Sequence, residues 1–262
     1  MKIKILILTI LILAITASIG FAQSKTKTKV VAATADLVVK NLYAVDKAGK
    51  GPFFQTKNRA LIDQYFTKDL ADMIWKDSVA AKGDLGAIDF NPLYNSQDPQ
   101  ITNLIVGKSR DAGGADNAFV DVTFKNAGKA DSVQYELARG TDKKWKIVGI
   151  YYSDGEDLGS VLRYWQDEEF KKEYENHAFK GEYTVGTDKC TVTPTLSGMS
   201  YRVQCNEQED FKLYLVEGTE TETAYINMDK KGVEKGKFVF KNGESSGKFI
   251  ASGKEVKVSP IK

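Results

Sequence analysis

Histidine is almost missing from this chain of 262 residues, since the one example is His177. Imidazole is the commonest general base and a frequent metal ligand. A metal site with two or more histidines is therefore excluded, and a Ser–His–Asp triad would have to use His177. The sequence also contains no GxSxG nucleophile elbow, which argues against a serine hydrolase. We assign no catalytic residue, no metal and no cofactor.

Complete phosphate and calcium loops are lacking as well. Gly107-Lys108-Ser109 resembles the end of a phosphate-binding loop, but Thr102 stands where the motif requires its first glycine. The segment Asp111–Asn117 has the composition of a calcium loop, but Val122 occupies the position of the bidentate glutamate. Both segments are interpreted as turns.

Long apolar runs occur only at the start of the chain. Two lysines precede the run Ile5–Leu13, and small residues lead up to Ala22. This order predicts a signal peptide, residues 1–22, cleaved near Ala22–Gln23. The alternative is a membrane anchor, but the run is short and lysines follow it closely. We expect a periplasmic or secreted protein with a flexible lead-in (23–29), no later membrane span and, without a nearby cysteine, no lipid anchor.

Net charge is lacking once this leader is removed. The leader holds two of the 37 basic residues and none of the 35 acidic ones, so the mature chain is formally neutral. Binding to nucleic acid or to an anionic membrane depends on excess positive charge. We therefore expect no nucleic acid partner. The expected partner is an unidentified small ligand or envelope protein, and the sequence sets no oligomeric state.

Cysteine is scarce, with two in the chain. Cys190 and Cys205 lie on either side of Ser197-Gly198. If these two residues form a hairpin turn, Val192 faces Val203 and the two cysteines face each other within disulfide range. The alternative is free or redox-active thiols, but CxxC spacing and an activating charge are absent. For an exported protein we predict a Cys190–Cys205 disulfide.

The first part of the mature chain has helical and then strand patterns. Apolar residues recur at helical spacing over 30–45, and two shorter helical patterns follow Asn58 and Thr67, which are suited to capping them. A sheet of four antiparallel strands is then predicted. Its strands are Ile101–Gly107, Ala118–Asn126, Ser132–Arg139 and Lys144–Tyr152.

The fourth strand is predicted to differ from the others because both faces are apolar. Trp145, Ile147 and Tyr151 lie on one face, and Val148, Ile150 and Tyr152 on the other. We expect this strand to be central or covered on both sides.

Two further units follow the sheet. Asp157 is expected to start a linker helix, 158–180, with a break near Asp167. From Gly181 short alternating segments separated by turns predict an all-β domain, 181–262, a meander that forms a small barrel or sandwich. The fold class is α+β: a domain over 30–157 with helices packed on a curved antiparallel sheet, then the all-β domain.

The segment 86–100 is a long loop that mixes apolar and polar side chains. Such loops are usually held in place for a reason. We select it, together with two aromatic residues of the fourth strand, as the candidate ligand-binding site. The candidates are Asp89, Asn91, Tyr94, Asn95, Asp98, Trp145 and Tyr151. The alternative role of the polar residues is to pin the loop through side-chain caps.

Three stretches together resemble an exported bacterial family known as domain of unknown function 3828. They are Lys40–Asp77, Ile88–Asp98 and Lys144–Gly155, and the resemblance covers roughly 30–162. It implies a cystatin-like or nuclear-transport-factor-2-like fold. The family has no established activity, so it supplies no catalytic residue. Several members are lipoproteins, and this chain departs from them in lacking a lipidation cysteine.

Three functions remain open. The first is non-catalytic binding of a small ligand or protein partner in the cell envelope. The second is an inhibitor or immunity protein against a secreted hydrolase such as lysozyme, with the acidic segment Glu207–Glu222 meeting a basic target. The third is a hydrolase or isomerase using carboxylates inside the cone of the sheet, for which Asp89 or Asp98 would have to be buried in a cavity.

Overall fold

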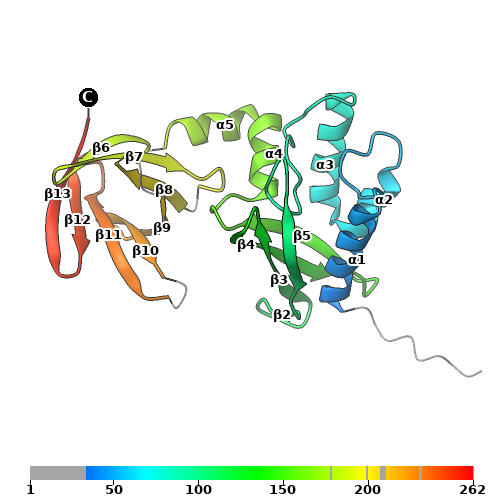
Figure 1. Cartoon of the computed structure of the whole chain (residues 1–262). Helices are drawn as coiled ribbons and strands as arrows, with labels where there is room; N and C mark the ends of the chain where they lie inside the picture. Colours follow the sequence, from blue (N-terminus) through cyan, green and yellow to red (C-terminus); the bar gives the residue numbers. More distant parts are fainter. Residues whose placement is uncertain (1–33, 178, 199, 207–210, 230–231, 262) are drawn as a thin grey trace, which may run out of the picture. The chain divides into compact units, whose positions relative to one another are not determined.

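The computed structural model describes residues 34–177, 179–198, 200–206, 211–229 and 232–261. Helices and one sheet occupy the chain up to Glu175, and a closed β-barrel follows from Gly181 (Figure 1). The α+β class and the terminal all-β unit are thus confirmed, and that unit is a barrel rather than a sandwich. The predicted signal peptide and lead-in lie outside the described residues. No helix in the described ranges is long and apolar enough to cross a bilayer.

Helices α2 to α5 begin directly after the residues that the sequence predicted, whereas α1 begins at Ala35 and not at residue 30. They are α1 (Ala35–Lys47), α2 (Arg59–Tyr65), α3 (Lys68–Ala81), α4 (Leu158–Gln166) and α5 (Glu168–Glu175). The break at Asp167 is confirmed, because its side chain accepts hydrogen bonds from the Glu169 and Phe170 amides and so caps α5. Asn58 and Thr67 occupy the N-cap positions of α2 and α3 but make no side-chain capping bond.

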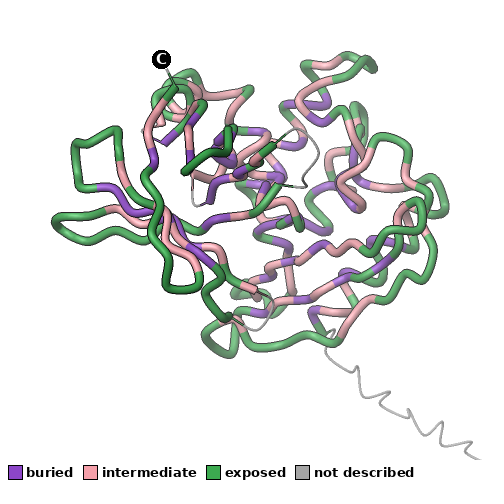
Figure 2. The backbone as a smooth tube through the Cα atoms, turned by 60° about the vertical axis from the view of Figure 1, so that its left-hand side comes forward, coloured by how far each residue is buried: buried purple, intermediate pink, exposed green. Residues whose placement is uncertain are grey.

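The sheet is antiparallel, in the order β1-β3-β4-β5, with β2 also paired to β3. Its strands are β1 (Ile101–Val106), β2 (Arg110–Asp111), β3 (Asn117–Asn126), β4 (Lys129–Arg139) and β5 (Trp145–Tyr152). Alternate residues of β3 and β4, such as Val122 and Tyr135, are buried in one hydrophobic cluster with residues of the helices. Buried residues run along helices and strands, whereas connecting loops are largely exposed (Figure 2).

The prediction for β5 was wrong. Its pairing with β4 shifts by one residue, since Glu136 faces Gly149 but Leu137 faces Ile147. This β-bulge leaves Val148 as the extra residue, 39% exposed, and turns both Ile147 and Ile150 into the core. β5 is the last strand of the sheet rather than a central one, and its outer edge meets Phe66 through an isolated bridge.

The barrel is an eight-stranded antiparallel meander that closes by pairing its last strand with its first. Tyrosine and phenylalanine rings fill its interior together with valines. The strands are β6 (Gly181–Val185), β7 (Asp188–Pro194), β8 (Ser200–Cys205), β9 (Lys212–Gly218), β10 (Glu222–Met228), β11 (Glu234–Lys241), β12 (Gly247–Ala251) and β13 (Lys254–Pro260).

The linker helix is shorter than predicted. It ends at Glu175, and Phe179, which was assigned to it, is 2% exposed in the middle of the barrel. The Phe179 ring stacks on Tyr225 with ring centroids 4.2 Å apart. An eight-stranded barrel is just wide enough for side chains to fill, and Phe179 fills much of this one.

The predicted disulfide is confirmed. Cys190 and Cys205 are bonded, and Val192 pairs with Val203 as the hairpin register required. The one histidine, His177, follows the end of α5. It is half-buried, with Nδ1 2.8 Å from the Tyr201 hydroxyl.

A buried carboxylate joins the β5–α4 connection to the β7–β8 hairpin. Glu156 accepts hydrogen bonds from the Leu196 amide (2.8 Å) and from Arg202 Nη2 (2.7 Å). Burial raises the pKa of Glu156, and the two donors oppose that shift. The sequence alone carried no signal for this pair.

Candidate functional site

The loop 86–100, predicted as a ligand site, is held by hydrogen bonds from α1, α3 and β5. The buried carboxylate of Asp77, in α3, accepts hydrogen bonds from the backbone amides of Ala87 (2.7 Å) and Ile88 (3.2 Å). Tyr43 of α1 donates to the Leu93 carbonyl at 2.8 Å. Tyr152 of β5 donates to the Pro92 carbonyl at 3.2 Å. These bonds hold the loop against the core.

The polar residues of the loop serve the same purpose. Asn91 Oδ1 accepts from the Leu93 amide at 2.9 Å, and Asn95 Nδ2 donates to Asp154 at 3.1 Å. Asp89 is exposed and accepts from Gln97 at 3.2 Å, and Asp98 is exposed as well. The alternative of carboxylate catalysis required burial of Asp89 or Asp98, and neither is buried.

Among the candidate residues of the loop, Tyr94 packs against the core, beside the fully buried Ile88 and Leu93. Its ring contacts those of Tyr43 and Phe124, with centroids 5.6 and 5.5 Å away. Beside it lies Asp46, a half-buried residue that sequence reasoning missed. Burial raises the pKa of Asp46, and a hydrogen bond with Asn91 opposes the shift. No pattern in the sequence indicated Asp46. In the structure, a Cβ at Gly51 would lie 2.6 Å from Asp46 Oδ1, so the half-buried carboxylate leaves room only for glycine there.

Trp145 and Tyr151 lie away from this loop and from each other. Their positions in β5 are six residues apart, which is about 20 Å along an extended strand. Trp145 packs on the core under the Arg139 guanidinium, 5.2 Å from the ring centroid. Tyr151 lies on the exposed face of the sheet and donates to Glu136 at 2.7 Å. The predicted residues therefore do not form one site.

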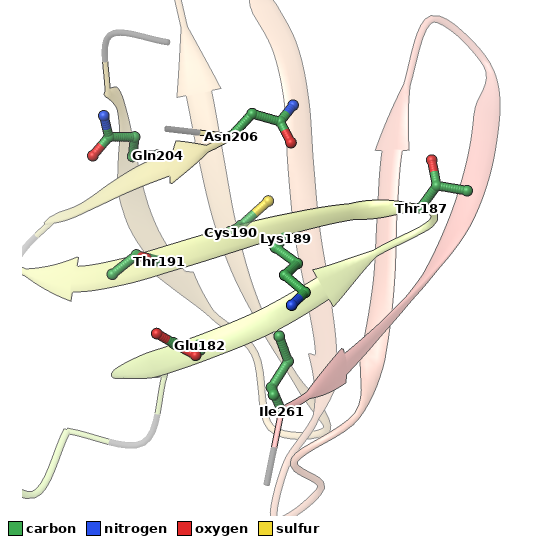
Figure 3. A pocket seen from close by; sticks show the side chains of 8 residues that line it. All are labelled: Glu182, Thr187, Lys189, Cys190, Thr191, Gln204, Asn206 and Ile261. Atoms are coloured by element: carbon green, nitrogen blue, oxygen red, sulfur yellow. The ribbon is translucent and has the colours of Figure 1, made fainter. Parts of the chain in front are cut away.

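Cavities occur instead in the barrel. The larger one is a groove of about 860 Å³ on the outer wall of β6, β7 and β8 (Figure 3). We call it the wall groove. In Figure 3 the Lys189 side chain extends from β7 across β6 toward Ile261. Its lining residues are Glu182, Thr187, Lys189, Cys190, Thr191, Gln204, Asn206 and Ile261.

The wall groove is polar and nearly balanced in charge. Glu182 and Lys189 are its charged residues, and the rest are hydroxyls, amides, one isoleucine and a disulfide cysteine. Within the described ranges, no hydrogen bond or ion pair engages the side chains of Glu182, Lys189 or Thr191. No described residues form a group of three His, Cys, Asp or Glu suited to a metal.

A smaller cavity of about 110 Å³ lies at one end of the barrel. We call it the barrel mouth. Its floor is aromatic, made of Phe179, Tyr183, Tyr225 and Phe240, and its rim is the β11–β12 turn with Thr223 of β10. Neither cavity was predicted. The barrel mouth is assembled from segments far apart in the sequence, whereas the wall groove is formed by the consecutive strands β6, β7 and β8 together with Ile261.

Comparison with known proteins identifies no family for this chain. No profile of a known protein family matches the chain, and no curated protein matches its sequence. A phospholipid-binding protein from Ralstonia solanacearum, solved in complex with a phospholipid, is 16% identical, with a TM-score of 0.30. The match covers 55% of this chain and 88% of that one. So loose a superposition defines neither the fold nor the ligand of the present chain.

Proposed function

We propose that this chain is an exported, non-catalytic binding protein, with the wall groove as its ligand site. The observation that carries the proposal is the groove itself, whose volume falls within the range usual for ligand pockets. The carboxylate of Glu182, the amine of Lys189 and the hydroxyl of Thr191 make no hydrogen bond or ion pair within the described ranges, and they suit a polar ligand of low net charge with hydrogen-bonding groups along its length. A short glycan or a peptide has this chemistry.

A binding role fits the chemistry of the groove better than catalysis does. Its cysteine is held in a disulfide and is not a nucleophile. Its lining contains no histidine, and within the described ranges neither Glu182 nor Lys189 makes an ion pair. The groove offers recognition groups without a reacting pair.

Export is supported by the disulfide, because such bonds persist in oxidising compartments. We retain the signal peptide, the cleavage near Ala22–Gln23 and the periplasmic or secreted location as parts of the proposal. The relation of residues 30–162 to the exported family of unknown function 3828, with its cystatin-like fold, also stays a proposal and rests on the motifs quoted above.

Nuclear magnetic resonance tests the groove. Chitooligosaccharides and short neutral peptides are titrated into the mature chain, and amide shifts are mapped. We expect saturable shifts along β6, β7 and β8, weakened by Glu182→Gln and Lys189→Gln. The matched control is Lys257→Gln, an exposed lysine of β13 with no ion-pair partner among the described residues. Saturable shifts confined to the loop 86–100 would contradict the proposal.

The inhibitor remains a second candidate, and one observation favours it. The β9–β10 hairpin exposes Glu217, Glu220 and Glu222 next to the exposed Leu215 and Val216. No basic residue occurs from Leu213 to Asp229. Residues 207–210, which include the rest of the predicted acidic segment, lie outside the described residues. Acidic groups around an apolar patch match the surface of a basic enzyme.

A lysozyme assay tests this candidate directly. We expect the mature chain to inhibit a basic lysozyme stoichiometrically. Changing Glu217, Glu220 and Glu222 to glutamine should weaken inhibition, and raising the salt concentration should do the same because charge attraction is screened. Full lysozyme activity at excess protein would exclude this candidate and leave the groove proposal standing.

A further inference from the structure

The barrel mouth is lined by a buried tyrosine whose hydroxyl has no protein partner among the described residues. Tyr183 is 4% exposed and lines the cavity, yet its hydroxyl makes no hydrogen bond within the part of the chain that the structure describes. Every fully enclosed side-chain nitrogen or oxygen among those residues does have a partner. The Tyr183 oxygen must therefore reach open space, and the space beside it is the mouth. The hydroxyl is therefore free to bond a polar group that enters the mouth.

The size of the mouth limits that occupant. A water molecule takes about 30 Å³, so 110 Å³ corresponds to roughly three or four waters. A dry cavity that binds benzene is larger, about 150 Å³. A single narrow side chain ending in a polar group fits this space, whereas a whole sugar or aromatic ring is too large for it.

The rim sets the charge of the occupant. Glu244 lines the mouth, and Asn242 of the same turn holds the neighbouring acidic hairpin. Asn242 Nδ2 donates to the Glu220 carbonyl at 3.0 Å, and Thr223 donates to Asn242 Oδ1 at 3.0 Å. These bonds fix the chain at Glu220 next to the cavity. Glu244 and Lys241 are the charged residues of the lining, and the exposed Glu220 and Glu222 of the adjoining hairpin add negative charge beside it.

We propose that the barrel mouth binds a basic side chain, lysine or arginine, presented by a partner protein. Aromatic faces attract a cation through their quadrupole, and the mouth offers Tyr225 and Phe240 as its floor. The Tyr183 oxygen accepts a hydrogen bond from the cation, and Glu244 neutralises its charge at the opening. The alkyl part of the side chain lies against the rings. For the identity of the partner this inference rests on the inhibitor candidate.

The test uses small cations, so it does not require the partner. n-Butylammonium and arginine amide are titrated into the mature chain at low salt, and the tyrosine and phenylalanine ring shifts are followed. We expect saturable shifts at Tyr183, Tyr225 and Phe240. n-Butanol has the same alkyl chain without charge and should bind more weakly. Equal binding of n-butanol, or tighter binding of N-acetylglucosamine, would overturn the inference.

Three variants separate the contributions. Glu244→Gln and Tyr183→Phe should each weaken cation binding about two- to fivefold, the range of a single cation–aromatic or charge contact. Glu234→Gln is the matched control, because Glu234 lies at the other end of β11 from the mouth. An unchanged amide spectrum establishes that each variant folds. Equal affinity of Glu244→Gln and the parent chain would refute the role of the rim.

If the cations bind but no lysozyme is inhibited, the proposed cation site in the barrel mouth is supported and the inhibitor function is excluded. If lysozyme is inhibited while small cations leave the rings unshifted, the candidate stands and the mouth is refuted.

Discussion

Phe179 should be the most sensitive single position of the barrel. Its ring is 2% exposed and lies within 6 Å, centroid to centroid, of five other rings. Phe179→Ala removes this ring and leaves a cavity, which typically costs about 3–5 kcal/mol. A domain is usually stable by about 5–15 kcal/mol, so the variant barrel should be marginal. Its ring neighbours are Tyr183, Tyr201, Tyr225, Phe238 and Phe240.

The assay is amide hydrogen exchange followed by mass spectrometry, with guanidinium unfolding in parallel. All three tryptophans precede residue 181, so tryptophan fluorescence reports the α+β part and not the barrel. We expect lost protection in the strands β6 to β13. Phe211→Ala is the control, since Phe211 is 43% exposed and its loss should cost less than about 1 kcal/mol. A cost for Phe179→Ala as small as that of the control would refute its placement in the core.

Three further predictions follow from single contacts. Changing both Cys190 and Cys205 to serine opens a loop of 15 residues and should lower the free energy of unfolding, measured with denaturant, by about 3 kcal/mol. Equal stability of the parent chain with and without reductant would contradict this. Asp77→Ala leaves the backbone amides of Ala87 and Ile88 without their acceptor and should lower the free energy of unfolding by about 2–4 kcal/mol. Faster hydrogen exchange at these two amides is the decisive measurement. Asp121→Asn tests pH dependence, because the hydrogen bond from Arg110 lowers the pKa of Asp121. The parent chain should be more stable to unfolding than the variant above pH 4, by under about 1 kcal/mol for this half-exposed pair. This difference in stability should be lost as pH falls through the lowered pKa. An advantage that persists at pH 2 would show that the carboxylate charge is not its source.

Local signals were enough for much of the fold. The caps at Asp157 and Asp167 depend on residues within three positions, and both are found. The pairing of Cys190 with Cys205 follows from a short turn, because a hairpin register is set by the turn between its strands.

The structural roles of the candidate loop residues could not be predicted from the sequence, for a physical reason. Polar residues in a long loop look alike whether they bind a ligand or hold the backbone, and Asn91 and Asn95 hold the backbone here. The bulge at Val148 could not be read from alternation, since one inserted residue reverses which side chains face the core. Phe179 looked like the end of a linker because its ring partners lie on strands later in the chain.

The amino-acid sequence by itself determined the order of helices, sheet and all-β unit, and the register of the disulfide hairpin. Each of these depends on spacing within some twenty residues, where periodicity and turn chemistry act directly. Only the tertiary structure decided the closing of β13 onto β6, the filling of the barrel by Phe179, and the barrel mouth. These features arise from contacts between distant segments, and local periodicity carries no information about which distant segments will meet.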